Sequence, residues 1–174
     1  MKKRTAKENL KLKGGLRKLN RRERSEIYLI LDNIRSMYNV GAMFRTADGA
    51  RVKKIFLCGI TATPPRNKIF KTSLGAVEWV EWEYISSAKL IVQSLKQEGV
   101  QIVCLEQTDK SLDFKKAKYK KPVAIIVGHE LRGISNEVLK EADLIVEIPM
   151  HGRANSLNVA TACGVVLFEV ASKI

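Results

Sequence analysis

The sequence predicts an α/β fold built on a core of parallel strands. Strand-like and helix-like stretches alternate along the chain, and the central strand-like runs are apolar at every position rather than at every second one. Continuously apolar strands are typical of a parallel sheet that helices cover on both faces. The length of 174 residues suits one domain with a sizeable core. We therefore expect a single α/β domain over residues 25–174.

A basic segment precedes this domain. Residues 1–24 contain eleven Lys and Arg and two Glu, a net charge of +9, out of +13 for the whole chain. Each Lys or Arg laid on a phosphate releases condensed counterions, so a basic arm on a near-neutral body favours a nucleic-acid partner. The alternatives are a merely solubilising segment or one held at an anionic membrane surface. We expect residues 1–24 to form a flexible basic tail that meets RNA or DNA.

The first half of the domain predicts strands and helices in alternation. Residues 26–34 form an apolar run that ends in Asp-Asn, as in a buried strand that stops at a polar loop. Residues 39–50 have helical apolar spacing, and residues 53–60 form a second strand, followed by a loop with two prolines. Residues 77–85 alternate apolar and acidic side chains, as in a strand near a sheet edge. Residues 87–99 indicate a helix that stops at a glycine.

The second half predicts three more strands and a final helix. The strands fall within residues 100–108, 122–128 and 143–149, and the middle one is almost purely apolar. Residues 156–173 form a helix that is apolar on nearly every face. A helix with so little polar surface is either buried under neighbouring elements or forms a dimer interface.

Four polar loops leave the carboxyl ends of these strands, where parallel α/β sheets bind ligands. They span residues 32–39, 106–111, 128–133 and 149–158. The sequence has no GxGxxG and no phosphate-binding P-loop, which disfavours a nucleotide hydrolase or a dinucleotide-dependent dehydrogenase.

Arg45 is the unusual residue of the first predicted helix. It lies beside the apolar stripe, between Gly41 and Gly49. One interpretation is an exposed arginine that pairs with Asp48. The other is that the two glycines let a substrate or another chain approach the helix, so that the guanidinium binds a phosphate.

Several polar residues of these loops have both a structural and a functional interpretation. Asn39 stands where a helix N-cap is expected. Asn155, Ser156 and Asn158 precede the last helix, where capping needs only one of them and a helix N-terminus can also bind an anion or a ribose. Glu130 follows a buried strand and is either an exposed loop carboxylate or a site residue.

The cysteines and histidines predict no metal centre. Cys58, Cys104 and Cys163 each stand in an apolar run, without a CxxC or Cys/His cluster, and are expected to be reduced core residues. No apolar run approaches the length of a membrane span, and the charged N-terminus does not read as a signal peptide. We expect a cytoplasmic protein that binds neither membrane nor metal.

Three blocks of the sequence, in this order, resemble the three motifs of the SpoU/TrmH family of RNA ribose 2′-O-methyltransferases, in the SPOUT superfamily. NVGAMFRTADGA (39–50) resembles motif 1, IIVGHELRGIS (125–135) motif 2, and IPMHGRANSLNVATACGVVLFE (148–169) motif 3. LEQTDKSLDF (105–114) resembles the segment that precedes motif 2. The resemblance covers about residues 26–172, and the ordered triple is more specific than any one motif.

The resemblance implies a SPOUT fold, in which the C-terminal segment is threaded as a deep trefoil knot, an exception to the rule that chains are unknotted. It also implies S-adenosylmethionine as cofactor and a homodimer. The positions that match the family's cofactor pocket are Gly128, Ile148 and Leu157, with Thr108, Met150 and Ser156 nearby. The positions that match its functional polar residues are Asn39, Arg45, Glu130, Ser156 and Asn158.

The implied reaction is methylation of a ribose 2′-OH in tRNA or rRNA. In the mechanism suggested for the family, the arginine and an adjacent RNA phosphate assist deprotonation of the hydroxyl. Orienting the phosphate and stabilising the developing alkoxide is a physically easier role for Arg45. Asn39, Ser156 and Asn158 would then fix Arg45 and the ribose. Glu130 would orient the loop and substrate.

One position departs from the family pattern: His129 stands where Asn is usual, a change expected to alter local hydrogen bonds but not the shape of the loop. The alternative function is a non-catalytic knotted RNA-binding or ribosome-assembly protein. The five matching polar residues argue against that alternative.

Overall fold

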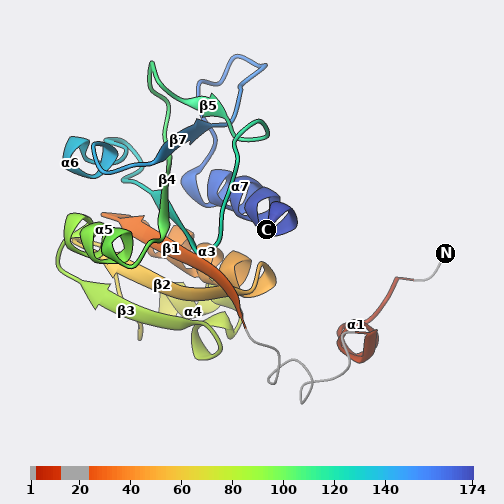
Figure 1. The fold of residues 1–174 in the computed structure, drawn as a ribbon. Coiled ribbons are helices and arrows are strands. Elements are labelled where there is room, and N and C mark those ends of the chain that lie inside the picture. Colours follow the sequence, from red (N-terminus) through yellow and green to blue (C-terminus); the bar gives the residue numbers. More distant parts are fainter. Residues whose placement is uncertain (1–2, 13–23) are drawn as a thin grey trace.

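The computed structural model describes residues 3–12 and 24–174, and in these residues a seven-stranded parallel sheet forms the centre of the molecule (Figure 1). The strand order is β3-β2-β1-β6-β4-β7-β5. The strands are β1 (Ser25–Asp32), β2 (Val52–Cys58), β3 (Glu81–Ile85), β4 (Gln101–Leu105), β5 (Leu112–Asp113), β6 (Val123–Val127) and β7 (Leu144–Glu147). Every strand pair is parallel, which confirms the expected fold class.

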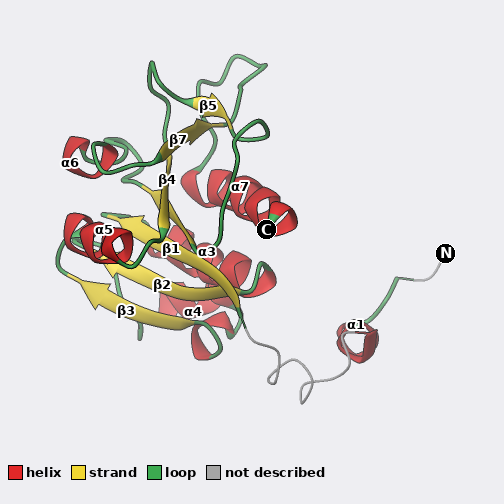
Figure 2. Cartoon of the chain, in the orientation of Figure 1, coloured by secondary structure: helices red, strands yellow, loops and turns green. Residues whose placement is uncertain are grey.

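Helices cover both faces of the sheet (Figure 2). The helices are α1 (Ala6–Leu12), α3 (Met37–Gly49), α4 (Asn67–Ser73), α5 (Ala88–Gln97), α6 (Asn136–Leu139) and α7 (Val159–Lys173), with a 3-10 turn η1 (Ala76–Glu78). Residues of α3, α4 and α7 share one apolar core with the sheet, and residues of α5 and α6 share a second core. The domain is therefore a three-layer α/β/α arrangement.

The fully buried strand β6 explains the continuous apolar run in the sequence. It lies between β1 and β4. Ile125 belongs to the core under α3 and α7, whereas its neighbour Ile126 belongs to the core under α5. Because successive side chains of a strand point to opposite faces, a sheet covered on both sides needs an apolar residue at each position.

The structure differs from the sequence-based prediction at the start of β3 and at helix α4. Residues 77–80 were expected to open a strand, but η1 ends at Glu78 and β3 begins only at Glu81. The edge position of β3 is confirmed, and its exposed Glu81 and Glu83 pair with Lys54 of β2 at 3.1 and 2.8 Å. Helix α4 was not predicted, because it is short and follows directly after the two prolines.

Gly41 and Gly49 have a packing role, which corrects the interpretation that they leave room for a substrate. A Cβ on Gly41 would overlap Thr72 and the backbone carbonyl of Ile69, so Gly41 lets α4 lie against α3. A Cβ on Gly49 would come within 3.3 Å of the Phe168 ring of α7. Both glycines therefore allow close helix packing.

The basic N-terminal segment contains a capped helix. Thr5 and Glu8 form a capping box at the start of α1, with the Glu8 N–H 3.2 Å from Thr5 Oγ1 and the Thr5 N–H 2.6 Å from Glu8 Oε2. Most of the expected flexible tail, residues 1–2 and 13–23, lies outside the described residues. Arg24 contacts the domain, donating to Asp48 at 3.0 Å and to the Trp79 carbonyl at 2.8 Å.

Among the helices in the described part of the chain, none combines the length and the apolar character needed to cross a membrane. Cys58, Cys104 and Cys163 are buried free thiols, as predicted. Burial raises the pKa of each thiol to about 12.

Candidate active site

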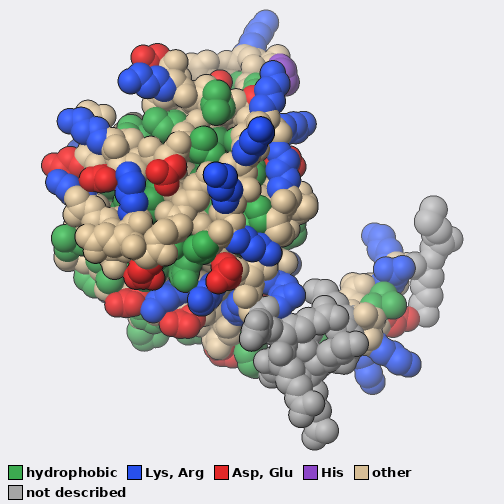
Figure 3. Space-filling model, viewed as in Figure 1, with side chains coloured by type: hydrophobic (Ala, Val, Ile, Leu, Met, Phe, Trp, Pro, Cys, Tyr) green, Lys and Arg blue, Asp and Glu red, His purple; other side chains and the backbone are tan. Residues whose placement is uncertain are grey.

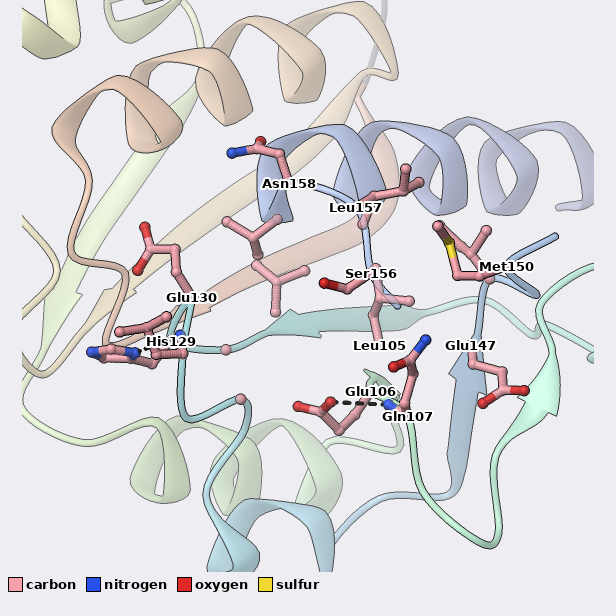
Figure 4. A pocket seen from close by; sticks show the side chains of 17 residues that line it. Leu105, Glu106, Gln107, His129, Glu130, Glu147, Met150, Ser156, Leu157 and Asn158 are labelled. Atoms are coloured by element: carbon pink, nitrogen blue, oxygen red, sulfur yellow. Dashed lines mark hydrogen bonds between the residues drawn. The ribbon is translucent and has the colours of Figure 1, made fainter. Parts of the chain in front are cut away.

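A cavity of about 350 Å³ lies beyond the carboxyl ends of β4, β6 and β7, beside the start of α7 (Figure 4). Its lining comes from four segments far apart in the sequence: 105–107, 127–133, 147–150 and 156–162. Glu130 and His129 lie toward one end of the cavity, and Met150 and Glu147 toward the other. Three of the four polar loops singled out from the sequence therefore meet here.

The loop after β6 is a tight turn that closes on itself. His129 and Gly133 exchange two backbone hydrogen bonds, of 3.1 and 2.8 Å. A Cβ on Gly128 would overlap the backbone of Gly133, so only glycine fits there. Glu106, which follows β4, accepts the Ile134 N–H at 2.9 Å and anchors the base of the loop. The loop is thus fixed by hydrogen bonds between its own two ends and by a hydrogen bond to Glu106, which follows the neighbouring strand.

His129 performs the hydrogen bonding that a side-chain amide could supply in this turn. Its Nδ1 accepts the N–H of Leu131 at 3.0 Å and that of Arg132 at 3.3 Å. The accepting nitrogen must carry no proton, which places the ring proton of a neutral imidazole on Nε2. Histidine in place of asparagine therefore keeps a side-chain acceptor within the turn.

Glu130, Asn39 and Asn158 form a hydrogen-bonded chain at the edge of the cavity. Asn39 Nδ2 donates to Glu130 Oε1 at 2.9 Å, and Asn158 Nδ2 donates to Asn39 Oδ1 at 3.2 Å. The Glu130 carboxylate also accepts the backbone N–H of Arg35 at 2.9 Å and of Ser36 at 3.0 Å. One residue from each of the three motif-like blocks contributes to this chain.

These hydrogen bonds stabilise the ionised form of Glu130. Partial burial favours the protonated carboxyl, but the N–H groups of Arg35 and Ser36 and the amide of Asn39 favour the carboxylate and together lower the pKa of Glu130. The carboxylate is thus ionised at neutral pH and fixed by donors.

The expectation that Asn39 caps α3 is wrong. The N-cap is Ser36, whose Oγ accepts the Asn39 N–H at 3.3 Å. Asn39 lies one turn further, so its side chain is free to bridge Glu130 and Asn158. Asn158 is the cap of α7, where its Oδ1 accepts the N–H of Ala160 at 3.0 Å.

The residues expected to bind a cofactor mostly line the cavity. Five of the six do so: Gly128, Ile148, Met150, Ser156 and Leu157. Thr108 instead forms a turn with Ser111, whose Oγ donates to the Thr108 carbonyl at 2.8 Å. Ser156 lines the cavity together with Glu130 and Asn158.

Arg45 lies outside this cavity, exposed on α3. Asp48, its expected partner, pairs with Arg24, and within residues 3–12 and 24–174 no carboxylate forms an ion pair with Arg45. Three of the five expected polar residues therefore line the cavity, Asn39 is hydrogen-bonded to two of them at its edge, and Arg45 lies exposed on α3.

Three polar residues of the cavity were not predicted individually as site residues, although two of them lie in the polar loop 106–111. Glu106 and Gln107 directly follow β4, and Glu147 ends β7. Glu147 accepts the Ser111 hydroxyl at 2.6 Å, and Gln107 donates to the Asn155 carbonyl at 2.9 Å, so both tie neighbouring loops together. Their position at the carboxyl end of a parallel strand, where ligands usually bind, is the feature of the sequence that could have identified them.

The lining of the cavity suits an organic ligand. In the described ranges, no three His, Cys, Asp or Glu side chains are grouped to hold a metal ion. The cavity instead combines apolar walls, from residues such as Leu105, Ile148 and Leu157, with carboxylate and amide oxygens. This mixture is typical of a small-molecule site, in which apolar walls hold the ligand and a few polar groups orient it.

Comparisons with known proteins agree with this arrangement. The model of the SpoU rRNA Methylase family matches residues 26–168. The chain is 32% identical over 155 residues to the tRNA (guanosine(18)-2′-O)-methyltransferase of Aquifex aeolicus, covering 88% of this chain and 72% of that protein. It is 34% identical to an uncharacterized tRNA/rRNA methyltransferase of Mycoplasma genitalium, of which it spans 58%.

Solved structures give the same result. The structure of the A. aeolicus TrmH/SpoU tRNA modifying enzyme matches with a TM-score of 0.82 and 29% identity, over 96% of this chain and 83% of that one. The AdoMet-bound rRNA methyltransferase from Sinorhizobium meliloti matches with a TM-score of 0.80 and 32% identity, over 88% and 59%.

The fold and cavity together are those of an α/β RNA methyltransferase that uses S-adenosylmethionine. Within this class, the chain belongs to the SpoU family of RNA 2′-O-methyltransferases.

Proposed function

We propose that this protein transfers the methyl group of S-adenosylmethionine to a ribose 2′-OH of a structured RNA. The observation that carries the proposal is the chain of hydrogen bonds from Glu130 through Asn39 to Asn158, at the rim of a cavity large enough for the cofactor. This chain of hydrogen bonds brings together, at one point of the structure, the three sequence blocks that resemble the family motifs.

The cavity fits the cofactor in size and chemistry. Its volume of about 350 Å³ lies in the range of small-molecule sites. Gly128, Ile148 and Leu157 would hold the adenine largely through backbone groups, with Met150 and Ser156 nearby. Thr108 would support the loop from outside the cavity. When bound, the cofactor supplies a methyl group activated by a positively charged sulfur.

The chain's own residues would position the acceptor. The 2′-OH must stand in line with the methyl carbon, and holding it there is a large part of catalysis. Asn39 and Asn158, each fixed by a hydrogen bond, would orient the ribose together with Ser156. Glu130 holds the segment before α3 against the loop after β6 through the N–H groups of Arg35 and Ser36.

Arg45 would act on the phosphate next to the reacting ribose. Its exposed guanidinium can bind a phosphate bidentately and stabilise the alkoxide that develops as the hydroxyl loses its proton. This role requires Arg45 to lie near a cofactor cavity. Arg45 does not line the cavity of its own subunit. We propose that it reaches the cavity of the partner subunit.

The homodimer is supported by the surface of α7. Val165 is 40% and Phe168 52% exposed on this helix, and Phe168 lies over Gly49 of α3, close to Arg45 in sequence. Exposed aromatic and aliphatic side chains on one helix are typical of a subunit interface. A partner copy on this surface would bury them and bring its cavity near Arg45.

The trefoil knot belongs to the same proposal. Two features are compatible with threading of the C-terminal segment. Strand β4 lies between β6 and β7, and both the loop after β6 and the segment before α7 contribute residues to the cavity. The likeness to SpoU structures with TM-scores of 0.82 and 0.80 supports it further.

The proposed substrate is tRNA or rRNA. The relatives are named for both, and the A. aeolicus proteins for tRNA, which makes tRNA the first substrate to test. On the face seen in Figure 3, Lys and Arg side chains predominate on the side of α7, whereas basic and acidic side chains are mixed toward β3 and α5. The basic tail of residues 1–24 would add contacts to phosphates, in a cytoplasmic protein.

Substitution of Arg45 tests this assignment. We expect Arg45→Ala to bind S-adenosylmethionine and to dimerise as the wild type does, but to lose about 100-fold or more in methyl transfer to tRNA, since a group that stabilises developing charge is removed. Single-turnover transfer, calorimetric cofactor binding and sedimentation measure the three properties. Unchanged transfer would remove Arg45 from the mechanism. Cofactor binding without transfer to any RNA by the wild type would favour the non-catalytic alternative.

A further inference from the structure

A second cavity, of about 630 Å³, lies on the other side of the loop after β6. It opens where β1 and β6 end, and its lining includes Asp32, Arg35, Ile60, His129, Leu131 and Arg132. His129 and Leu131 also line the first cavity, so this loop separates two adjacent hollows. In parallel sheets the carboxyl ends of the strands are where ligands bind.

The rim of this second cavity combines apolar and cationic side chains. Ile60 is 64% and Leu131 83% exposed, and both line this cavity. Arg35 and Arg132 are exposed beside them. Aliphatic side chains pack against the faces of unstacked bases, and arginines bind phosphates, so this rim fits a nucleotide.

The floor of the cavity holds a buried carboxylate. Asp32 is 3% exposed and accepts hydrogen bonds from Asn33 Nδ2 at 2.8 Å and, weakly, from the Ser135 N–H at 3.5 Å. No Lys or Arg of the described segments forms an ion pair with it. A carboxylate has about four acceptor positions, so Asp32 retains acceptor capacity that these two contacts leave unused.

The two cavities are joined through one short segment. Asp32 ends β1, and the N–H groups of Arg35 and Ser36 bind Glu130, which lies at the rim of the first cavity. The Asn33 side chain accepts the Ile60 N–H at 3.0 Å and so fixes one wall of the second cavity to the same segment. The segment between β1 and α3 therefore lines the second cavity through Asp32, Asn33 and Arg35 and is also bound to the loop that carries Glu130.

We propose that the second cavity binds an unstacked guanine base of the RNA substrate, with Asp32 accepting hydrogen bonds from guanine N1–H and N2–H. Guanine presents two adjacent donors on its Watson–Crick edge, whereas adenine, cytosine and uracil each place an acceptor next to their donor, which a carboxylate repels. Ile60 and Leu131 contact the base, and Arg35 and Arg132 contact the flanking phosphates. The inference rests on the proposed function only for the statement that the guanine belongs to an RNA.

Methyl NMR of the full chain tests the pocket directly. The protein is labelled with ¹³C at Ile and Leu methyl groups, S-adenosylhomocysteine is added in excess to fill the first cavity, and GMP, AMP, CMP and UMP are titrated separately. We expect GMP to shift the Ile60 and Leu131 methyl signals at about tenfold lower concentration than the other three. Absence of shifts at these two residues, or equal shifts with all four nucleotides, would overturn the proposal.

Two variants separate recognition from folding. Asp32→Asn should lose the preference for GMP, whereas Asp109→Asn, which changes an exposed carboxylate outside both cavities, should keep it. Leu131→Ala changes a side chain that is 83% exposed, so it should fold normally and bind GMP several-fold more weakly. An Asp32→Asn protein that still prefers GMP would contradict the assignment.

The readout is independent of methyl transfer. A chain that selects GMP in this assay but never methylates RNA would contradict the proposed function and retain the pocket. A chain that methylates RNA without selecting GMP would contradict the pocket alone.

Discussion

At the residue scale, Glu130 connects the site most directly to stability. Its two carboxylate oxygens accept three donors, from Arg35, Ser36 and Asn39, at 2.9 to 3.0 Å. A glutamine would keep one acceptor oxygen and turn an NH₂ group toward a donor. We expect Glu130→Gln to lower the free energy of unfolding by about 1–3 kcal/mol and methyl transfer by more than about tenfold, as measured by urea unfolding and by single-turnover assay.

The pH dependence of this loss has a definite sign. The folded protein holds the pKa of Glu130 below the ordinary value of 4.5, so the carboxylate stabilises the fold above that value, and the contribution disappears as the pH falls through the folded pKa. The difference between wild type and Glu130→Gln should shrink in acid. Glu137→Gln, which alters only an exposed pair with Lys89, is the control and should change little. A difference that grows in acid would contradict the account.

Asp32 should behave in the opposite way. Burial raises its pKa above the ordinary 3.8, despite hydrogen bonds from Ser135 and Asn33. The folded state therefore binds this proton more tightly than the unfolded state, and stability declines as the pH rises from 3.8 through the folded pKa. Asp32→Asn should melt at a higher temperature than the wild type near pH 8, with the difference vanishing toward pH 4. Equal melting temperatures of the wild type and Asp32→Asn at both pH values would show that the ionised Asp32 carboxylate does not destabilise the fold.

At the element scale, the sequence was informative where a pattern reports burial. The wholly apolar β6 and the alternating β3 were predictable because burial on two faces and exposure at an edge leave different patterns. Helix α4 was missed because its seven residues hold too few buried positions for a period to show. The N-cap of α3 was misplaced because Ser36 and Asn39 are both good capping residues, and only the tertiary contact of Asn39 with Glu130 distinguishes them.

The packing of α3 against α4 gives a prediction at this scale. A Cβ at Gly41 would overlap the backbone of Ile69, which cannot move without shifting α4. We expect Gly41→Ala to lower the free energy of unfolding by about 1–3 kcal/mol in chemical denaturation. Gly164 of α7 is the matched control, because a Cβ there would lie 3.6 Å from Thr46, an ordinary contact. Gly164→Ala should be neutral or stabilising, and equal effects of the two substitutions would contradict the packing role of Gly41.

At the scale of the whole molecule, the sequence predicted the members of the site better than their arrangement. Resemblance to the family motifs identified Glu130, Ser156 and Asn158, which line one cavity, and Asn39, which is hydrogen-bonded to two of them. It did not identify Glu106, whose role depends on which backbone the neighbouring strand brings to it. Arg45 was identified as a site residue but lies outside the cavity of its own subunit, and its role stays a prediction.

The proposed dimer predicts the effect of a charge on α7. Phe168→Asp would place a carboxylate on a surface that the partner should bury, so we expect a monomer in sedimentation and loss of methyl transfer. Leu90→Asp changes a residue of similar exposure on α5, across the sheet, and should leave the dimer intact. A dimeric, active Phe168→Asp protein would place the subunit interface elsewhere.

The central claim is the reaction, and methyl transfer from labelled S-adenosylmethionine to unmodified tRNA and rRNA tests it most directly. The RNA is digested to nucleosides after the reaction, and the labelled species is identified by mass spectrometry. The account predicts a labelled 2′-O-methyl nucleoside, with 2′-O-methylguanosine as the product if the second cavity selects guanine. Label on a base rather than on a ribose would contradict the assigned reaction, and no label in either RNA, with the cofactor bound, would contradict catalysis on these substrates.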